Sequence, residues 1–173
     1  MASTQETLKS PAQLVTPSGK MQLRGSELID GQRIPDRHTL YGENVAPALS
    51  WSGTPREAKS FVLLSTDPDA MRVASREWVH WAVVDIPPDT ASIPEGGKLP
   101  AGARELKNDF GKTSYGGPKP PPGTGVHHYL FALYALRVPK LEVKSGASLE
   151  EIRKAIAPQA IDQAVLVGTF ERK

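Results

Sequence analysis

The sequence contains no cysteine among its 173 residues. Disulfides, thiolate chemistry and cysteine-based zinc sites are therefore excluded, and the composition fits a reducing compartment. An excess of one charge is also nearly absent, because 21 basic and 19 acidic residues leave a formal net charge of +2. So small an excess indicates neither nucleic-acid binding nor attraction to a membrane surface. Because the sequence has no apolar stretch typical of a signal peptide or a membrane span, we expect a cytoplasmic protein without an integral membrane segment.

Glycine and proline, by contrast, are abundant, with 15 and 16 residues respectively. Hydrophobic residues make up 39% and charged residues 23%, which are values typical of a folded globular protein with many turns. The length fits one domain, 1–173, and the polar residues 1–19 are interpreted as a loose lead-in.

Five apolar or alternating runs predict strands. They cover residues 21–24, 61–64, 78–86, 128–138 and 165–170. Several are apolar on both faces, which is typical of strands that lie between two layers. The segments 87–107 and 108–125 are long and irregular, and loops of this length in a compact domain are usually functional. A mostly-β fold is therefore expected.

One helix is well indicated near the C-terminus. Ser148 and Glu151 form a capping box at its start, and Ile152 and Ile156 mark an apolar face. Pro158 ends or kinks this helix, and another helical turn is expected over residues 159–164.

Two aspartates follow the buried strand 61–64. Asp67 and Asp69 surround Pro68, and a simple turn is the more frequent meaning of such a triplet. Their position at a strand end also suits carboxylates that line a pocket. Both interpretations remain open from the residues alone.

Three ring side chains are further candidates. His80 lies within an apolar strand, where a structural histidine is the commoner case, and its buried ring needs a partner such as an aspartate from a neighbouring strand end. His127 and Tyr129 are two apart and share a strand face, while His128 points the other way. Together with amides of the preceding glycine-rich loop, these groups suit a phosphate, sulfate or carboxylate.

Three other functions were weighed. Histidines and aspartates can bind a metal, but no local spacing typical of metal ligands supports this, so no metal or cofactor is expected. Ser65, Ser75 and Ser114 lie outside any nucleophile motif, so we expect no enzyme activity. Inhibition of a protease or kinase through surface loops is the alternative function. No motif in the sequence supports or excludes it.

Four blocks of sequence resemble the phosphatidylethanolamine-binding protein family, also called Raf kinase inhibitor-like proteins, in its prokaryotic branch. The blocks are residues 44–51 with Pro55, residues 67–70, His80-Trp81, and residues 117–129. Each block is weak alone, but four in this order are specific, and the resemblance spans about residues 23–170.

The resemblance implies a β-sandwich in which a large antiparallel sheet packs on a smaller one, with short C-terminal helices and an anion pocket at one end. Carried over to this chain, the ligand-binding residues would be Asp67, Asp69 at the rim, His80, Gly117 and Pro118 in the loop, His127 and Tyr129. The resemblance also implies a small anionic ligand such as phosphate, acetate or phosphoethanolamine, and a homodimer.

Two positions depart from the family pattern. Met71 replaces a proline, which predicts a looser pocket rim because proline would fix the backbone there. His128 replaces an arginine and is expected to affect a supporting contact. We therefore expect non-catalytic anion binding in which His80 and His127 donate hydrogen bonds. Asp67 is expected to orient a histidine or to accept from a ligand ammonium group.

Overall fold

Two antiparallel sheets form the frame of the protein in the computed structural model, which describes residues 4–173. The smaller sheet has the order β1-β2-β5 and the larger sheet the order β6-β4-β3-β7-β8. The strands are β1 Gln22–Gly25, β2 Leu49–Ser52, β3 Ser60–Asp67, β4 Trp78–Ile86, β5 Ser92–Ile93, β6 Arg104–Glu105, β7 His127–Leu136 and β8 Ala160–Phe170. This arrangement confirms the predicted sandwich of a large and a small sheet.

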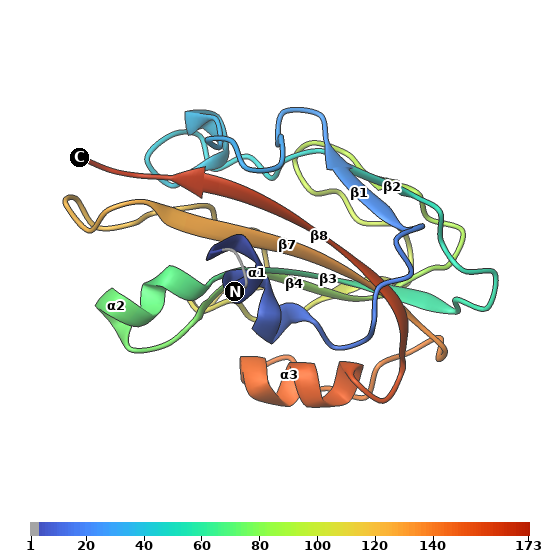
Figure 1. Cartoon of the computed structure of the whole chain (residues 1–173). Coiled ribbons are helices and arrows are strands. Elements are labelled where there is room, and N and C mark those ends of the chain that lie inside the picture. The colour runs from blue at the N-terminus through green and yellow to red at the C-terminus, as the bar shows by residue number, and fades with distance from the viewer. Residues whose placement is uncertain (1–3) are drawn as a thin grey trace.

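The larger sheet is covered on both faces. One face packs against the smaller sheet around a core that includes Trp51, Phe61 and Phe131. The other face packs against α3 (Leu149–Ile156) and the N-terminal segment around Val62 and Tyr134. Figure 1 shows β1 and β2 on one side of the large sheet and α3 on the other. Double coverage explains why β3, β4 and β7 are apolar at nearly every position.

Short helical segments complete the chain. They are α1 Thr4–Lys9, α2 Met71–Ala74 and the 3₁₀ turns η1 Ser10–Ala12, η2 Asp36–His38 and η3 Pro68–Ala70. None of the described helices is long and apolar enough to cross a membrane. The predicted capping box of α3 is confirmed, since Ser148 accepts from the Glu151 amide and the Glu151 carboxylate accepts from the Ser148 amide.

The predicted helical turn over residues 159–164 is wrong. Residues 160–164 belong to β8, which pairs with β7 from Ala160↔Leu136 to Phe170↔His127, and Gln159 lies in the turn before it. The apolar strand β7 would otherwise expose an unpaired edge there, so pairing between distant segments overrides the local tendency.

The N-terminal segment is docked rather than loose, so this prediction is also wrong for the described part of residues 1–19. The Gln163 side-chain oxygen accepts from the Leu14 and Val15 amides, and Asp162 accepts from the Ser18 amide and hydroxyl. Polar side chains on β8 therefore fix a segment whose own sequence carries no strand or helix pattern. Residues 1–3 lie outside the described residues.

The outer edge of β8 is covered by residues 31–34. The Gly31 amide donates to Val167, the Thr169 amide donates to Gln32, and the Ile34 amide donates to Thr169. Arg33 forms a parallel bridge with Thr169. These bonds occupy backbone groups that an edge strand would otherwise leave unpaired.

Candidate ligand-binding site

A cavity of about 190 Å³ lies at the end of the large sheet where β3 ends and where β4 and β7 begin. It is lined by Asp67, Ala70, Val73, Ala74, Trp78, His80, Phe110, Lys119, Pro120, Pro121, His127 and Tyr129. The volume is below the roughly 300–1,000 Å³ of pockets for drug-sized molecules, so the cavity fits a small group.

Four of the seven predicted site residues meet in this cavity: Asp67, His80, His127 and Tyr129. Strand pairing explains why these four residues lie close together. β3 lies between β4 and β7, and antiparallel pairing places Asp67 opposite Trp78 at one end of β3. The start of β7, which carries His127 and Tyr129, reaches the same end.

Asp67 and His127 form the polar centre of the site. His127 Nδ1 lies 2.6 Å from Asp67 Oδ2, and both side chains are almost fully buried. The other carboxylate oxygen, Oδ1, accepts from the Ala70 amide and so caps η3. The structure thus pairs Asp67 with a histidine, as expected from the sequence.

The second ring nitrogen of His127 is also engaged. Nε2 lies 3.0 Å from the Thr124 hydroxyl, which donates its hydrogen to the Pro121 carbonyl at 2.7 Å. Both ring nitrogens of His127 therefore have partners within the chain, Nδ1 in Asp67 and Nε2 in Thr124.

His80 has a different partner from the one predicted. Its Nδ1 lies 2.6 Å from the Gly116 carbonyl, whereas Asp67 is occupied by His127. Burial lowers the pKa of His80 below its ordinary value of 6.5, although the Gly116 carbonyl and the Asp67 charge oppose this. The ring is therefore neutral at pH 7, and Nδ1 carries its hydrogen. Nε2 is left as an acceptor.

Two buried donors at the cavity have no partner among the described residues: the Trp78 Nε1–H and the Tyr129 hydroxyl. The Tyr129 ring stacks near His127 and meets His80 edge-on. Burial raises the pKa of Tyr129, so its phenol keeps its proton and remains a donor. Buried polar atoms are nearly always hydrogen-bonded, so both donors indicate an acceptor supplied from outside the chain.

Three predicted site residues do not line the cavity. Asp69 accepts from the backbone amide and ring Nδ1 of His128, which explains why His128 points away as predicted. Gly117 donates its amide to the Asn44 side chain, and a Cβ at Gly117 would lie 2.2 Å from the His38 carbonyl oxygen. The Pro118 carbonyl accepts from the Leu40 amide. These residues position the surrounding segments.

Sequence reasoning missed several lining residues. Trp78 and Phe110 supply aromatic walls, Val73 comes from α2, and Lys119 supplies a cation. Trp78 begins the predicted strand 78–86, two residues before His80, but the sequence carries no signal that its ring lines a cavity. Lys119 lies within the glycine- and proline-rich loop. Its neighbours predicted a functional loop, but nothing in the sequence indicated that the Lys119 side chain lines the cavity.

Comparison with known proteins agrees with this arrangement. The family described as phosphatidylethanolamine-binding protein matches residues 24–171. A UPF0098 protein of Methanothermobacter thermautotrophicus is 42% identical over 156 residues, which cover 88% of this chain and 99% of the relative.

The chain belongs to the phosphatidylethanolamine-binding protein family. Escherichia coli YbcL, a member of that family with a solved structure, is 34% identical with a TM-score of 0.83. The match covers 89% of this chain and 99% of YbcL. The fold extends to a carboxypeptidase Y inhibitor solved with its cognate proteinase, at 18% identity and a TM-score of 0.58 over 97% and 93% of the two chains. The family assignment supports a binding role.

Substituting Asp67→Asn tests the central bond. We expect the free energy of unfolding to fall by about 3–5 kcal/mol, because the substitution breaks a buried pair by removing one partner. Asp69→Asn is the matched control, since its pair with His128 is more exposed, and it should cost about 1 kcal/mol. Urea unfolding at pH 7 measures both values, and equal costs would contradict the assignment of the buried pair.

Proposed function

We propose that the protein binds, without catalysis, a small anionic group that carries a hydrogen. The observation that supports this most directly is the pair of buried donors, Trp78 Nε1 and the Tyr129 hydroxyl, that meet no acceptor of the described chain. Both residues line one small cavity. An oxyanion supplies the missing acceptors.

The other polar groups narrow the class of ligand. Lys119 lines the cavity, is exposed, and forms no ion pair with another described residue, so it adds positive charge. Neutral His80 presents Nε2 as an acceptor, which requires a hydrogen on the ligand. A hydrogen phosphate, or a phosphomonoester such as free phosphoethanolamine that keeps one phosphate hydrogen, meets both demands.

The hydrogen-bond donors to the anion differ from those predicted from the sequence. His127 was expected to donate to the anion, but both its ring nitrogens already have partners. Its role is instead to occupy the Asp67 carboxylate through the 2.6 Å contact with Nδ1. Trp78 and Tyr129 take the donor role.

The proposal of a non-catalytic function rests on the sequence, in which no serine lies in a nucleophile motif. The cytoplasmic location and the homodimer remain predictions.

Replacing Tyr129 tests the proposed donor. Tyr129→Phe should weaken the binding of inorganic phosphate by about tenfold, because one hydrogen bond to a charged group is lost. Tyr134→Phe is the matched control: that phenol is equally buried, but it lies on the other face of the sheet and donates to Ala12. Isothermal titration calorimetry gives both affinities, and an unchanged affinity in the Tyr129 variant would reject this donor.

The pH dependence tests the acceptor role of His80. Sulfate carries no hydrogen near neutral pH, so it binds well only when His80 is protonated. Because burial lowers the pKa of His80 below 6.5, sulfate affinity should change little between pH 8 and 6.5 and should rise as the pH falls below 6.5. We expect a gain of about tenfold.

His80→Gln should remove most of this rise, because an amide donates without titrating. Phosphate, which carries its own hydrogen at pH 7, should bind the wild type better than sulfate there. A flat sulfate profile in the wild type would count against the proposal.

Inhibition of a protease is a second candidate, favoured by exposed apolar side chains near the cavity. Met71, Val73, Phe110 and Val126 are each at least 36% exposed. Arg72 donates to the carbonyls of Thr124 and Val126, so α2 and this loop lie side by side. Grouped exposed apolar side chains are typical of contact surfaces for other proteins.

Carboxypeptidase Y is a suitable probe for this candidate. The Met71→Ser/Val126→Ser double variant should weaken inhibition by tenfold or more and leave phosphate affinity unchanged, because neither residue lines the cavity. If the wild type leaves the protease uninhibited, the candidate fails for this class of enzyme.

A further inference from the structure

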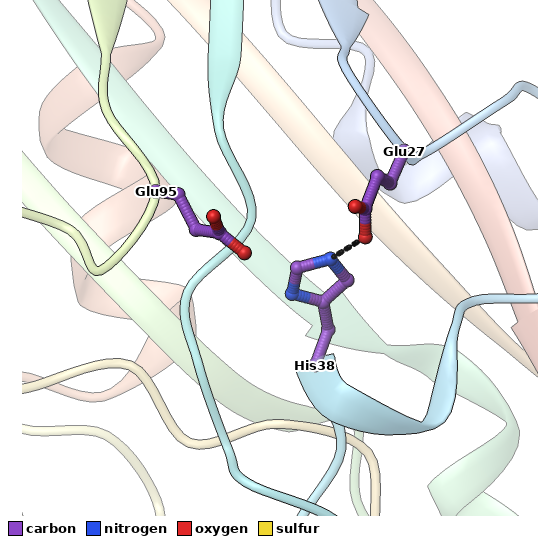
Figure 2. Close-up of side chains that lie close together, drawn as sticks. All are labelled: Glu27, His38 and Glu95. Carbon is purple, nitrogen blue, oxygen red and sulfur yellow. Dashed lines mark hydrogen bonds and ion pairs between the residues drawn. The ribbon is translucent and has the colours of Figure 1, made fainter.

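Three metal-ligating side chains converge away from the cavity. Glu27 lies just after β1, His38 ends η2, and Glu95 follows β5. Figure 2 shows the two carboxylates reaching toward the His38 ring from different segments of the chain. None of the three lines the ligand cavity.

The geometry of this cluster suits one ion. One ligand atom from each residue lies within 4.8 Å of the other two. His38 Nε2 lies 2.9 Å from Glu27 Oε2, and Nδ1 lies 2.8 Å from the Val45 carbonyl oxygen. A ring nitrogen that donates to a backbone carbonyl fixes the orientation of the ring and leaves the other nitrogen free for a metal.

The surroundings of His38 suit a metal ion. The side chain is 1% exposed, and its two nitrogens face the Val45 carbonyl and the Glu27 carboxylate. When Nδ1 donates to the Val45 carbonyl, Nε2 is left facing Glu27. The buried imidazole is an observation independent of the carboxylates, and it adds a nitrogen ligand where they converge.

Arg37 at present supplies part of the positive charge. Its guanidinium lies 2.5 Å from Glu95 Oε1 and 3.4 Å from Glu27 Oε1. The Arg37 side chain is 39% exposed and the two glutamates are 44% and 41% exposed, so all three can reorient at the surface. An incoming metal ion would therefore displace an exposed arginine rather than disturb the core.

We propose that Glu27, His38 and Glu95 bind a divalent transition-metal ion, with Zn²⁺ as the best fit. One imidazole and two carboxylates form a donor set that Zn²⁺ accepts in tetrahedral geometry, with water as the fourth ligand. The hard cations Mg²⁺ and Ca²⁺ prefer oxygen ligands alone, and the buried imidazole therefore selects against them.

A bound ion would join three loops that the sheets alone do not connect. The His38 carbonyl accepts from the Tyr115 hydroxyl, and the Leu40 amide donates to Pro118. Residues 115–118 lead directly into Lys119 and Pro120 of the ligand cavity. The ion would thus hold the segment against which the cavity loop packs. The proposal stands independently of the ligand that the cavity binds.

Titration of Zn²⁺ into the full chain tests the site. We expect one ion per chain, with at least tenfold weaker binding in each of Glu27→Gln and Glu95→Gln. Both positions are at the surface, so the variants should keep the fold, which circular dichroism checks. Co²⁺ should give visible absorption bands that the same variants lose. Arg37→Ala should raise the Zn²⁺ affinity, because it removes the competing cation.

Two controls separate this site from other donors. Glu57→Gln/Glu150→Gln removes two exposed carboxylates elsewhere and should leave Zn²⁺ affinity unchanged. His80→Gln alters the cavity and should also leave it unchanged. The proposal is overturned if wild type binds no Zn²⁺, if Glu27→Gln and Glu95→Gln bind as tightly as wild type, or if His80→Gln abolishes binding.

Discussion

The bond between Asp67 and His127 is the constraint on which the ligand cavity depends. One carboxylate oxygen caps η3 through the Ala70 amide, and the other holds the His127 ring at 2.6 Å. A single buried side chain therefore fixes the turn that leads into α2 and the first residue of β7. The cavity lies between these two elements, so its walls keep their shape only while this carboxylate keeps both partners.

The same constraint explains why polar chemistry gathers at one end of the sheet. The large sheet is covered on both faces by apolar cores, and burying a charge within them would be costly. At the strand ends the backbone turns away and polar partners become available. Asp67, His80 and His127 all lie at or near such ends, where loop carbonyls and hydroxyls satisfy the rings.

The sequence predicted the capped helix and five of the eight described strands, because apolar runs and a capping box are local signals. It missed β2, β5 and β6, which are two to four residues long. The prediction failed for segments whose structure depends on contacts with residues distant in the sequence. Residues 160–164 extend because β7 needs a partner, and the N-terminal segment is ordered by Gln163 and Asp162. In the site, strand positions predicted the meeting of Asp67, His80, His127 and Tyr129. They did not predict that Asp67 would bond to His127 and not to His80. The reason is that a bulge between Ser65 and Thr66 shifts the register between β3 and β4.

The segment 31–34 along β8 has a consequence for how this protein meets others. It pairs with Val167 and Thr169 near the end of β8, and the opposite edge of the sheet is formed by β6, which is two residues long. Another chain therefore finds these backbone groups already bonded, and strand addition at this end of β8 is blocked. Recognition at this end of the sheet, beside the ligand cavity, has to proceed through side chains and loops.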